Sequence, residues 1–220
     1  MPVRRIPPLG ARKNIGKFPS VKTGRVAWYE SLLERDYMYL LDRDAQVQQW
    51  EEQPLKIRFV HNGKTHHYTP DFEVHRTSKK QIIEVKPQKK VDSGEWDLLF
   101  RIATSLCARE GYEFLVVTDT TIRKQPGLEN VKKLWKYART PLLPQHQILC
   151  KKFFCRNHVP EISLGELLSY FRAEKIPVEV AYALIFFGAL EIDMTQPINP
   201  KNLIWIPSTA AASTTARKES

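Results

Sequence analysis

Between positions 24 and 42, apolar side chains recur every three or four residues, which is the spacing of one helix face. The runs that follow, at 55–60, 68–76 and 81–86, predict three strands, and Asn62-Gly63 predicts a hairpin turn after the first of them. Segments 95–110 and 128–137 return to helical spacing, with a short apolar strand at 114–118 between them. This α-β-β-β-α-β order predicts a three-layer α/β domain over residues 23–140.

Pro141 and Pro144 mark a boundary, after which the pattern changes. Ser163 and Glu166 have the spacing of a capping box and predict the start of a helix, and a second helix is expected from about 176 to 188. Short strands at 190–194 and 203–206 follow. Two helices followed by a two-stranded wing predict a small winged-helix domain over 141–207, and the Ser/Thr/Ala-rich tail 208–220 is expected to be disordered.

Composition excludes two classes of protein. The longest apolar run, 180–190, is too short to cross a bilayer, which takes about 20 residues, and the N-terminus lacks the apolar stretch of a signal peptide. Three cysteines cannot all pair, so a reducing cytoplasm is the expected location. We therefore expect neither a secreted nor a membrane protein.

The charge is strongly basic, with 34 Lys+Arg against 24 Asp+Glu and a formal net charge of +10. Almost all of the excess lies in residues 1–140, whereas 141–207 hold equal numbers of acids and bases. A basic block of this kind is typical of a DNA-binding surface, and the neutral segment suggests a protein partner. Residues 1–22 look like an extended arm without any acid, and its basic residues are Arg4, Arg5, Arg12, Lys13, Lys17 and Lys22.

Four residues form the candidate chemistry: Glu34, Asp71, Glu84 and Lys86. Glu84 and Lys86 are two apart on one strand and share a face, and a turn near Ser78-Lys79 would set Asp71 opposite Lys86. A turn of two or four residues keeps Asp71 on that face, whereas an odd number would flip it. Carboxylates held together repel each other unless a cation neutralises them, so the pattern favours magnesium or manganese. The lysine would orient or deprotonate a water. Charged pairs on a solvated strand face are the structural alternative.

The motifs resemble a known family. Tyr68-Thr-Pro-Asp71-Phe, followed by Ile83-Glu84-Val85-Lys86-Pro87, resembles the signature of PD-(D/E)XK nucleases. Together with 31–42 and 52–55, it more narrowly resembles the TnsA endonuclease family of heteromeric cut-and-paste transposases. The resemblance implies a restriction-endonuclease-like three-layer core and, more loosely over 150–207, a winged-helix domain. It also implies that Glu34 is the helix acid, that Asp71 and Glu84 bind Mg²⁺ (or Mn²⁺) with Glu34, and that Lys86 is the catalytic lysine.

Other residues near these motifs have two open interpretations each. Glu30, one helical turn before Glu34, is the rival helix acid. Gln53 would contact a phosphate or a metal-bound water, or else cap a turn. Lys89 and Lys90 would contact phosphates or lie in a plain solvated loop. The DNA-binding candidates are accordingly Gln53, Lys89 and Lys90 together with Arg4, Arg5, Arg12, Lys13 and Lys17 of the arm.

The family resemblance implies a function. A TnsA-like enzyme cuts the non-transferred strand at the 5′ ends of a transposon, with a DDE transposase (TnsB) and an AAA+ regulator (TnsC) as partners. The alternatives are a stand-alone restriction or repair nuclease and a non-catalytic DNA-binding adaptor of the same fold. The predicted second helix of the winged domain has almost no base-reading side chains, so we expect that domain to dock a protein rather than DNA.

Overall fold

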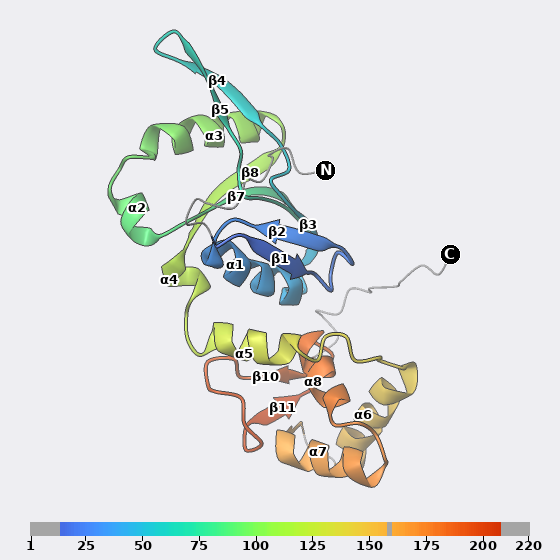
Figure 1. The fold of residues 1–220 in the computed structure, drawn as a ribbon. Helices are drawn as coiled ribbons and strands as arrows, with labels where there is room; N and C mark the ends of the chain where they lie inside the picture. Colours follow the sequence, from blue (N-terminus) through green and yellow to red (C-terminus); the bar gives the residue numbers. More distant parts are fainter. Residues whose placement is uncertain (1–13, 158–159, 208–220) are drawn as a thin grey trace. The chain divides into compact units, whose positions relative to one another are not determined.

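The computed structural model describes residues 14–157 and 160–207, and it divides the chain into two compact units, Met1–Leu128 and Glu129–Ser220 (Figure 1). Residues 1–13 of the predicted arm and the predicted tail 208–220 lie outside the described residues. No helix of the described residues has the length and hydropathy needed to cross a membrane.

The first unit alternates strands and helices. Its elements, in chain order, are β1 (Gly16–Pro19), β2 (Val26–Tyr29), α1 (Leu32–Arg43), β3 (Val47–Glu52), β4 (Ile57–His61), β5 (Lys64–Tyr68), β6 (Phe72–Arg76), β7 (Lys80–Lys86), α2 (Gln88–Asp92), α3 (Asp97–Arg109), β8 (Tyr112–Thr118) and α4 (Asp119–Ile122). Strands β3-β6-β7-β8 form the central sheet, in which only the β7–β8 pair is parallel. The hairpins β1–β2 and β4–β5 are separate two-stranded sheets.

Two helices cover opposite faces of the central sheet. Ile82 packs with Ala103 of α3, whereas Phe72, the cross-strand partner of Ile83, contacts Tyr37 of α1 at a ring-centroid distance of 5.5 Å. Because neighbouring residues of a strand point to opposite faces, α1 and α3 lie on opposite sides of β7. The predicted layered α/β fold is confirmed.

The N-terminal boundary of the predicted helix is wrong. Helix α1 begins at Leu32, since the side chain of Ser31 accepts a hydrogen bond from the Glu34 N–H and caps it. The residues before it form β2, which pairs with β1, so positions 16–19 of the predicted arm belong to the folded unit. Buried Asp42 anchors this segment by accepting hydrogen bonds from Ser20 Oγ at 2.6 Å and from the Val21 N–H at 2.8 Å.

The register of β6 and β7 differs from the prediction. The pairing of Phe72 with Ile83 puts Asp71 level with Glu84, two residues from the predicted partner Lys86. The reason is the turn, which spans 76–79 and is closed by a 2.8 Å hydrogen bond from the Arg76 N–H to the Lys79 carbonyl. Its even length keeps Asp71 on the face of Glu84 and Lys86, as expected.

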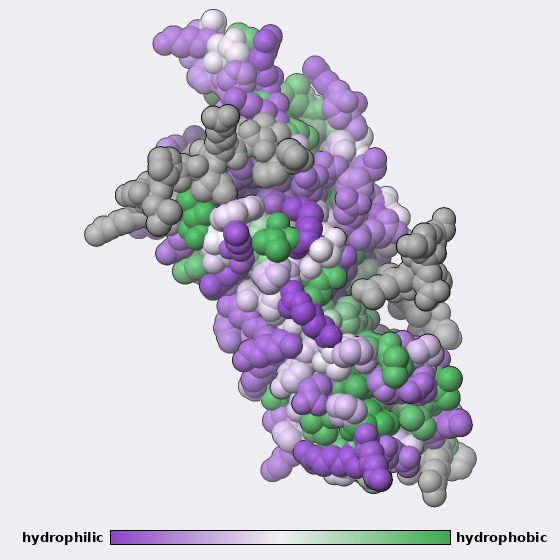
Figure 2. Space-filling view, turned by 45° about the vertical axis from the view of Figure 1, so that its right-hand side comes forward, coloured by the Kyte–Doolittle hydropathy of each residue, from purple (hydrophilic) through white to green (hydrophobic). Residues whose placement is uncertain are grey.

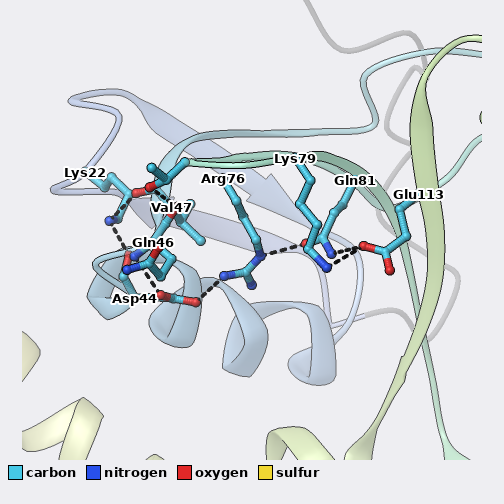
Figure 3. Close-up of polar contacts among 9 residues, drawn as sticks. Lys22, Asp44, Gln46, Val47, Arg76, Lys79, Gln81 and Glu113 are labelled. Carbon is cyan, nitrogen blue, oxygen red and sulfur yellow. Dashed lines mark hydrogen bonds and ion pairs between the residues drawn. The ribbon is translucent and has the colours of Figure 1, made fainter. Parts of the chain in front are cut away.

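A polar network braces that turn (Figure 3). The Arg76 guanidinium joins Asp44 at 2.5 Å and Gln81 at 2.7 Å, and Gln81 donates to Glu113 at 2.6 Å. Lys79 reaches the same Glu113 oxygen at 2.7 Å. These contacts tie the turn to the end of α1 and to β8, so they hold the register that brings the candidate site together.

The second unit is smaller. Its elements are α5 (Gly127–Trp135, which starts at the boundary), α6 (Pro144–Asn157), β9 (Glu161–Ser163), α7 (Leu164–Ala173), α8 (Glu179–Phe186), β10 (Glu191–Ile192) and β11 (Leu203–Trp205). The three strands form one sheet in the order β10-β11-β9, and the predicted capping box of Ser163 and Glu166 is present. Six of the eight residues of α8 are buried, so this helix is core, as the sequence indicated.

The two units divide between Leu128 and Glu129, which is earlier in the chain than the boundary expected at about 140. Asn130 of α5 is 1% exposed; its side chain donates to the carbonyls of Met194 and Gln196, at 3.1 and 2.7 Å, and accepts from the Ile198 N–H. Helix α5 is therefore tied to the C-terminal residues, and it belongs with the second unit.

Candidate active site

Asp71 lies at the start of β6, where the backbone aims its carboxyl group at the end of β7. Its N–H donates to the Ile83 carbonyl at 3.1 Å, which continues the strand pairing, and Oδ2 accepts from the Val85 N–H at 2.7 Å. Pro70 before it has no N–H and leads the chain into this position from β5. The Asp71 carboxyl is thus held by backbone bonds next to Glu84.

Glu84 is the most deeply buried acid of the group, with a side chain only 3% exposed. Tyr68 Oη donates to Oε2 at 2.5 Å, and Lys86 Nζ forms an ion pair with Oε1. A buried carboxylate is costly unless it is paired and hydrogen-bonded, and here each oxygen has its own donor. Tyr68 and Lys86 together fix the position of the Glu84 carboxylate.

Glu34 enters the site from the first turn of α1. Its Oε2 accepts from the Glu30 N–H at 2.7 Å. Burial raises the pKa of Glu34, and the charges of Glu30 and Glu84 raise it further. The hydrogen bonds from the Glu30 N–H and the Ser31 side chain lower it, but by less. Glu30 lies outside the helix rather than one turn earlier on its face, because Ser31 is the N-cap.

The charges of the four predicted residues shift one another's pKa values. The pKa of Asp71 is raised well above its ordinary value, first by burial and then by the charges of Glu84 and Glu34. A negative charge held close to a carboxyl group disfavours its ionisation and so raises its pKa. The structure therefore brings Glu34, Asp71, Glu84 and Lys86 into one cluster, although they come from α1, the start of β6 and β7.

Lys86 supplies positive charge to this cluster. Burial alone would lower its pKa, but Glu84, Asp71 and Glu34 outweigh that effect and raise it. The raised pKa favours the protonated ammonium, which can donate hydrogen bonds and stabilise negative charge. The Nζ atom also lies 4.7 Å from the centre of the Trp96 ring, a cation–π contact.

Sequence reasoning assigned no role to Tyr68 or Trp96. Tyr68 was part of the recognised motif, and its position three residues before Asp71 was the available signal. Trp96 falls inside the helix predicted over 95–110; it lies at the N-cap of α3, against Lys86. No local pattern connects Trp96 to Lys86, because their contact depends on the path of the chain through α2.

Gln53 links the acids instead of pointing into solvent. Its backbone φ of +45° makes a sharp bend after β3, and its N–H donates to the Asp71 carbonyl at 2.9 Å. Its side-chain amide donates to Glu30 Oε1 at 2.9 Å. Of the two open interpretations, the structure favours a bend-forming residue that also braces the acids.

The predicted DNA-binding cations lie in different places. Lys89 and Lys90 are exposed on α2, directly after β7. Lys17 is on β1, with Nζ 4.8 Å from the centre of the Trp28 ring. The arm residues Arg4, Arg5, Arg12 and Lys13 lie outside the described residues.

The donor chemistry fits a hard divalent cation. Carboxylate oxygens are the ligands that magnesium and manganese prefer, and three carboxyl groups outweigh the single charge of Lys86. Over residues 14–157 and 160–207, however, no group of three or more His, Cys, Asp or Glu side chains is positioned to hold a metal ion. Protein groups donate to both oxygens of Glu84 and to Oδ2 of Asp71. A cation would bind beside these donors or replace one of them.

Comparison with known proteins agrees with the motifs. Residues 44–119 match the family model of the TnsA-like endonuclease N-terminal domain, so the predicted resemblance to this family is confirmed over that segment. The match includes Asp71, Glu84 and Lys86, but Glu34 lies before it. No curated protein matches the chain. The matched domain supports a transposase-associated nuclease of the PD-(D/E)XK superfamily, members of which typically use divalent metals.

Proposed function

We propose that this protein is a metal-dependent DNA endonuclease that cuts the non-transferred strand at the 5′ ends of a transposon. The observation that carries the proposal is the cluster of Asp71, Glu84 and Lys86 inside the segment matched by a TnsA-like endonuclease domain, with Glu34 added by α1. Three acids and a lysine at one end of a sheet have the chemistry that phosphodiester hydrolysis needs.

Asp71 and Glu84, with Glu34, would hold Mg²⁺, for which Mn²⁺ would substitute. When bound, the cation would polarise the phosphodiester and make a bound water a stronger nucleophile. Lys86 donates hydrogen bonds from a protonated ammonium, so its role is to orient the water and to stabilise the negative charge that develops on the phosphate. Tyr68 and Gln53 position the acids through their hydrogen bonds to Glu84 and Glu30.

The partners follow from the family. We propose a TnsB-like DDE transposase for the other strand, a TnsC-like AAA+ ATPase as regulator, and transposon-end DNA as substrate. Phosphate contacts would come from the exposed Lys89 and Lys90 and from Lys17 and the arm.

The second unit is proposed to be a winged-helix-like domain that docks the regulator. Figure 2 shows apolar side chains gathered on the surface of this unit. Among the described residues of the unit, the large exposed apolar side chains are Leu143, Ile148, Phe187 and Leu203. Within the same described residues, Phe187 is exposed, whereas Phe154, Phe171 and Phe186 are buried. The apolar docking surface is therefore mainly aliphatic.

Strand-specific cleavage tests the enzymatic proposal. The full chain, a DDE transposase and an AAA+ regulator are incubated with transposon-end DNA labelled separately on each strand, with Mg²⁺. We expect a cut at the 5′ end of the non-transferred strand, its loss in Asp71→Asn, and its retention in the exposed control Glu95→Gln. Equal cutting by the wild type and Asp71→Asn would contradict the assignment.

A fragment tests the docking proposal. It must begin at 129 rather than 141, because α5 contributes buried Val131 and Leu134 as well as Asn130. We expect fragment 129–220 to bind the regulator and not end DNA, and fragment 141–220 to unfold at lower temperature. Salt-sensitive DNA binding without regulator binding would overturn the docking role.

A further inference from the structure

The β4–β5 hairpin carries a concentration of positive charge that the site described above does not use. Between Gln53 and Pro70 the chain has no acidic residue. The segment contains Lys56, Arg58 and Lys64, together with three histidines. None of these three cations forms an ion pair within the described residues, and all three are exposed. Cations without acidic neighbours are available to a polyanion.

The hairpin has one anchored face and one open face. Ile57 and Phe59 pack against the core beside α3, and Phe59 stacks on His66 with ring centroids 5.3 Å apart. The opposite face pairs Arg58 with His67 and Val60 with Thr65, and all four of these residues are exposed. In Figure 1 the hairpin projects beyond the central sheet, and the surface at its tip is mostly hydrophilic in Figure 2. The open face thus has no partner among the described residues 14–128 of its own unit.

The base of the hairpin is tied to the candidate active site. Tyr68 is the last residue of β5, and it is the residue whose Oη donates to Glu84 at 2.5 Å. The base of the hairpin therefore lies next to the acids, and the hairpin extends away from them along its length. Five residues at about 3.3 Å each give about 17 Å, which equals about five base pairs of B-DNA at about 3.4 Å per step.

We infer that the β4–β5 hairpin is a DNA-binding ribbon that lies along the duplex beside the scissile phosphate, with contacts up to about five base pairs away. A two-stranded ribbon is of a size that enters the major groove of B-DNA. The absence of acids and the unpaired Lys56, Arg58 and Lys64 favour duplex DNA over a protein partner. The location of the contacts relative to the cut rests on the proposed nuclease function; the binding itself does not.

The test compares two triple variants of the full chain. The ribbon variant is Lys56→Ala/Arg58→Ala/Lys64→Ala, and the control is Lys151→Ala/Lys152→Ala/Lys201→Ala, which removes three exposed lysines of the second unit. Affinity for duplex end DNA is titrated against salt in EDTA, where no metal-dependent cleavage occurs. Each lost phosphate contact should make the slope of log K against log salt shallower by about 0.9, so by about 2 to 3 in the ribbon variant and by none in the control.

Hydroxyl-radical footprinting then locates the contact. We expect protection within about five base pairs of the cut in the wild type and its loss in the ribbon variant, with an unchanged circular dichroism spectrum. Replacing Arg58 by Lys should keep the slope. A ribbon variant with wild-type slope and footprint would overturn the inference, and so would one that loses only the binding of a protein partner. Normal cleavage by a ribbon variant of this kind would leave the nuclease proposal standing. A shallower slope in the ribbon variant, together with no Mg²⁺-dependent cleavage by the wild type, would support the ribbon and contradict the nuclease proposal.

Discussion

Replacing Asp71 by Asn should abolish cleavage and yet stabilise the metal-free protein. Burial, Glu84 and Glu34 raise the pKa of Asp71, so the folded state disfavours its ionised form. Asparagine has nearly the same shape and keeps an oxygen that accepts the hydrogen bond from the Val85 N–H. The substitution therefore removes repulsion without leaving a donor unpaired.

The size of the effect follows from the strand register. Asp71 is level with Glu84, and residues opposite each other on antiparallel strands have Cβ atoms about 5 Å apart. Two unit charges about 5 Å apart at an effective dielectric constant of about 20 repel by about 3 kcal/mol. Lys86 offsets part of this, so we expect the free energy of unfolding to rise by about 1–2 kcal/mol. For a chain of this size, this corresponds to a rise in Tm of about 2–8 °C.

Thermal unfolding of the full chain in EDTA at pH 8 measures this gain, with Glu95→Gln as the control for removing an exposed carboxylate. Because the folded-state pKa of Asp71 lies above its unfolded value, the wild type carries the penalty at high pH and loses it as Asp71 becomes protonated. The difference between variant and wild type should therefore shrink on acidification. Added Mg²⁺ should raise the Tm of the wild type and not that of Asp71→Asn. A variant less stable than the wild type at pH 8 would refute the reasoning.

Two further predictions use the contacts of Glu84, and a third uses the burial of a cysteine in the second unit. Lys86→Met leaves the buried Glu84 carboxylate without its ion pair, so it should abolish cleavage and lower the free energy of unfolding by about 3 kcal/mol. In denaturant titrations, adding Glu84→Gln to this variant should restore the free energy of unfolding, whereas cleavage should stay absent. Tyr68→Phe removes a hydrogen bond to that carboxylate worth about 1.5–3 kcal/mol, and we expect cleavage 10- to 100-fold slower in single-turnover assays; a rate within twofold of wild type would exclude a positioning role. Burial raises the pKa of Cys150 to about 12, whereas Cys155 is exposed; a thiol-specific reagent at pH 8 should modify Cys155 quickly and Cys150 only after unfolding, as mass spectrometry of the modified peptides would show.

The sequence alone determined the local features of this protein. Helical spacing and the capping residues Ser163 and Glu166 act within a few residues of the chain, so the layered α/β class and the main helices of the second unit followed from them. The candidate residues Asp71, Glu84 and Lys86 could also be found, since the strands that carry them are adjacent and the alternation of a strand sets their shared face.

The short polar strands β1 and β3 could not be predicted from the local sequence pattern. Strand β1 lies in a segment whose prolines and basic residues predicted an extended arm, and β3 has the sequence Val-Gln-Gln-Trp-Glu-Glu, with little apolar content. Such segments become strands because a neighbour supplies the missing hydrogen bonds, β2 in one case and β6 in the other. Pairing partners of this kind are not encoded in local periodicity.

Only the tertiary structure decided the register and the chemistry of the site. A shift of one residue in the centre of the turn at 76–79 moved the partner of Asp71 from Lys86 to Glu84, and that turn is held by Arg76, through contacts to Asp44 and Gln81. The raised pKa of Lys86 depends on the charges of three acids from separate elements, which outweigh the burial of the lysine, and Trp96 reaches the lysine only through the fold. Hydrogen-bond partners and desolvation are properties of packed surfaces, so residues far apart in the chain set them.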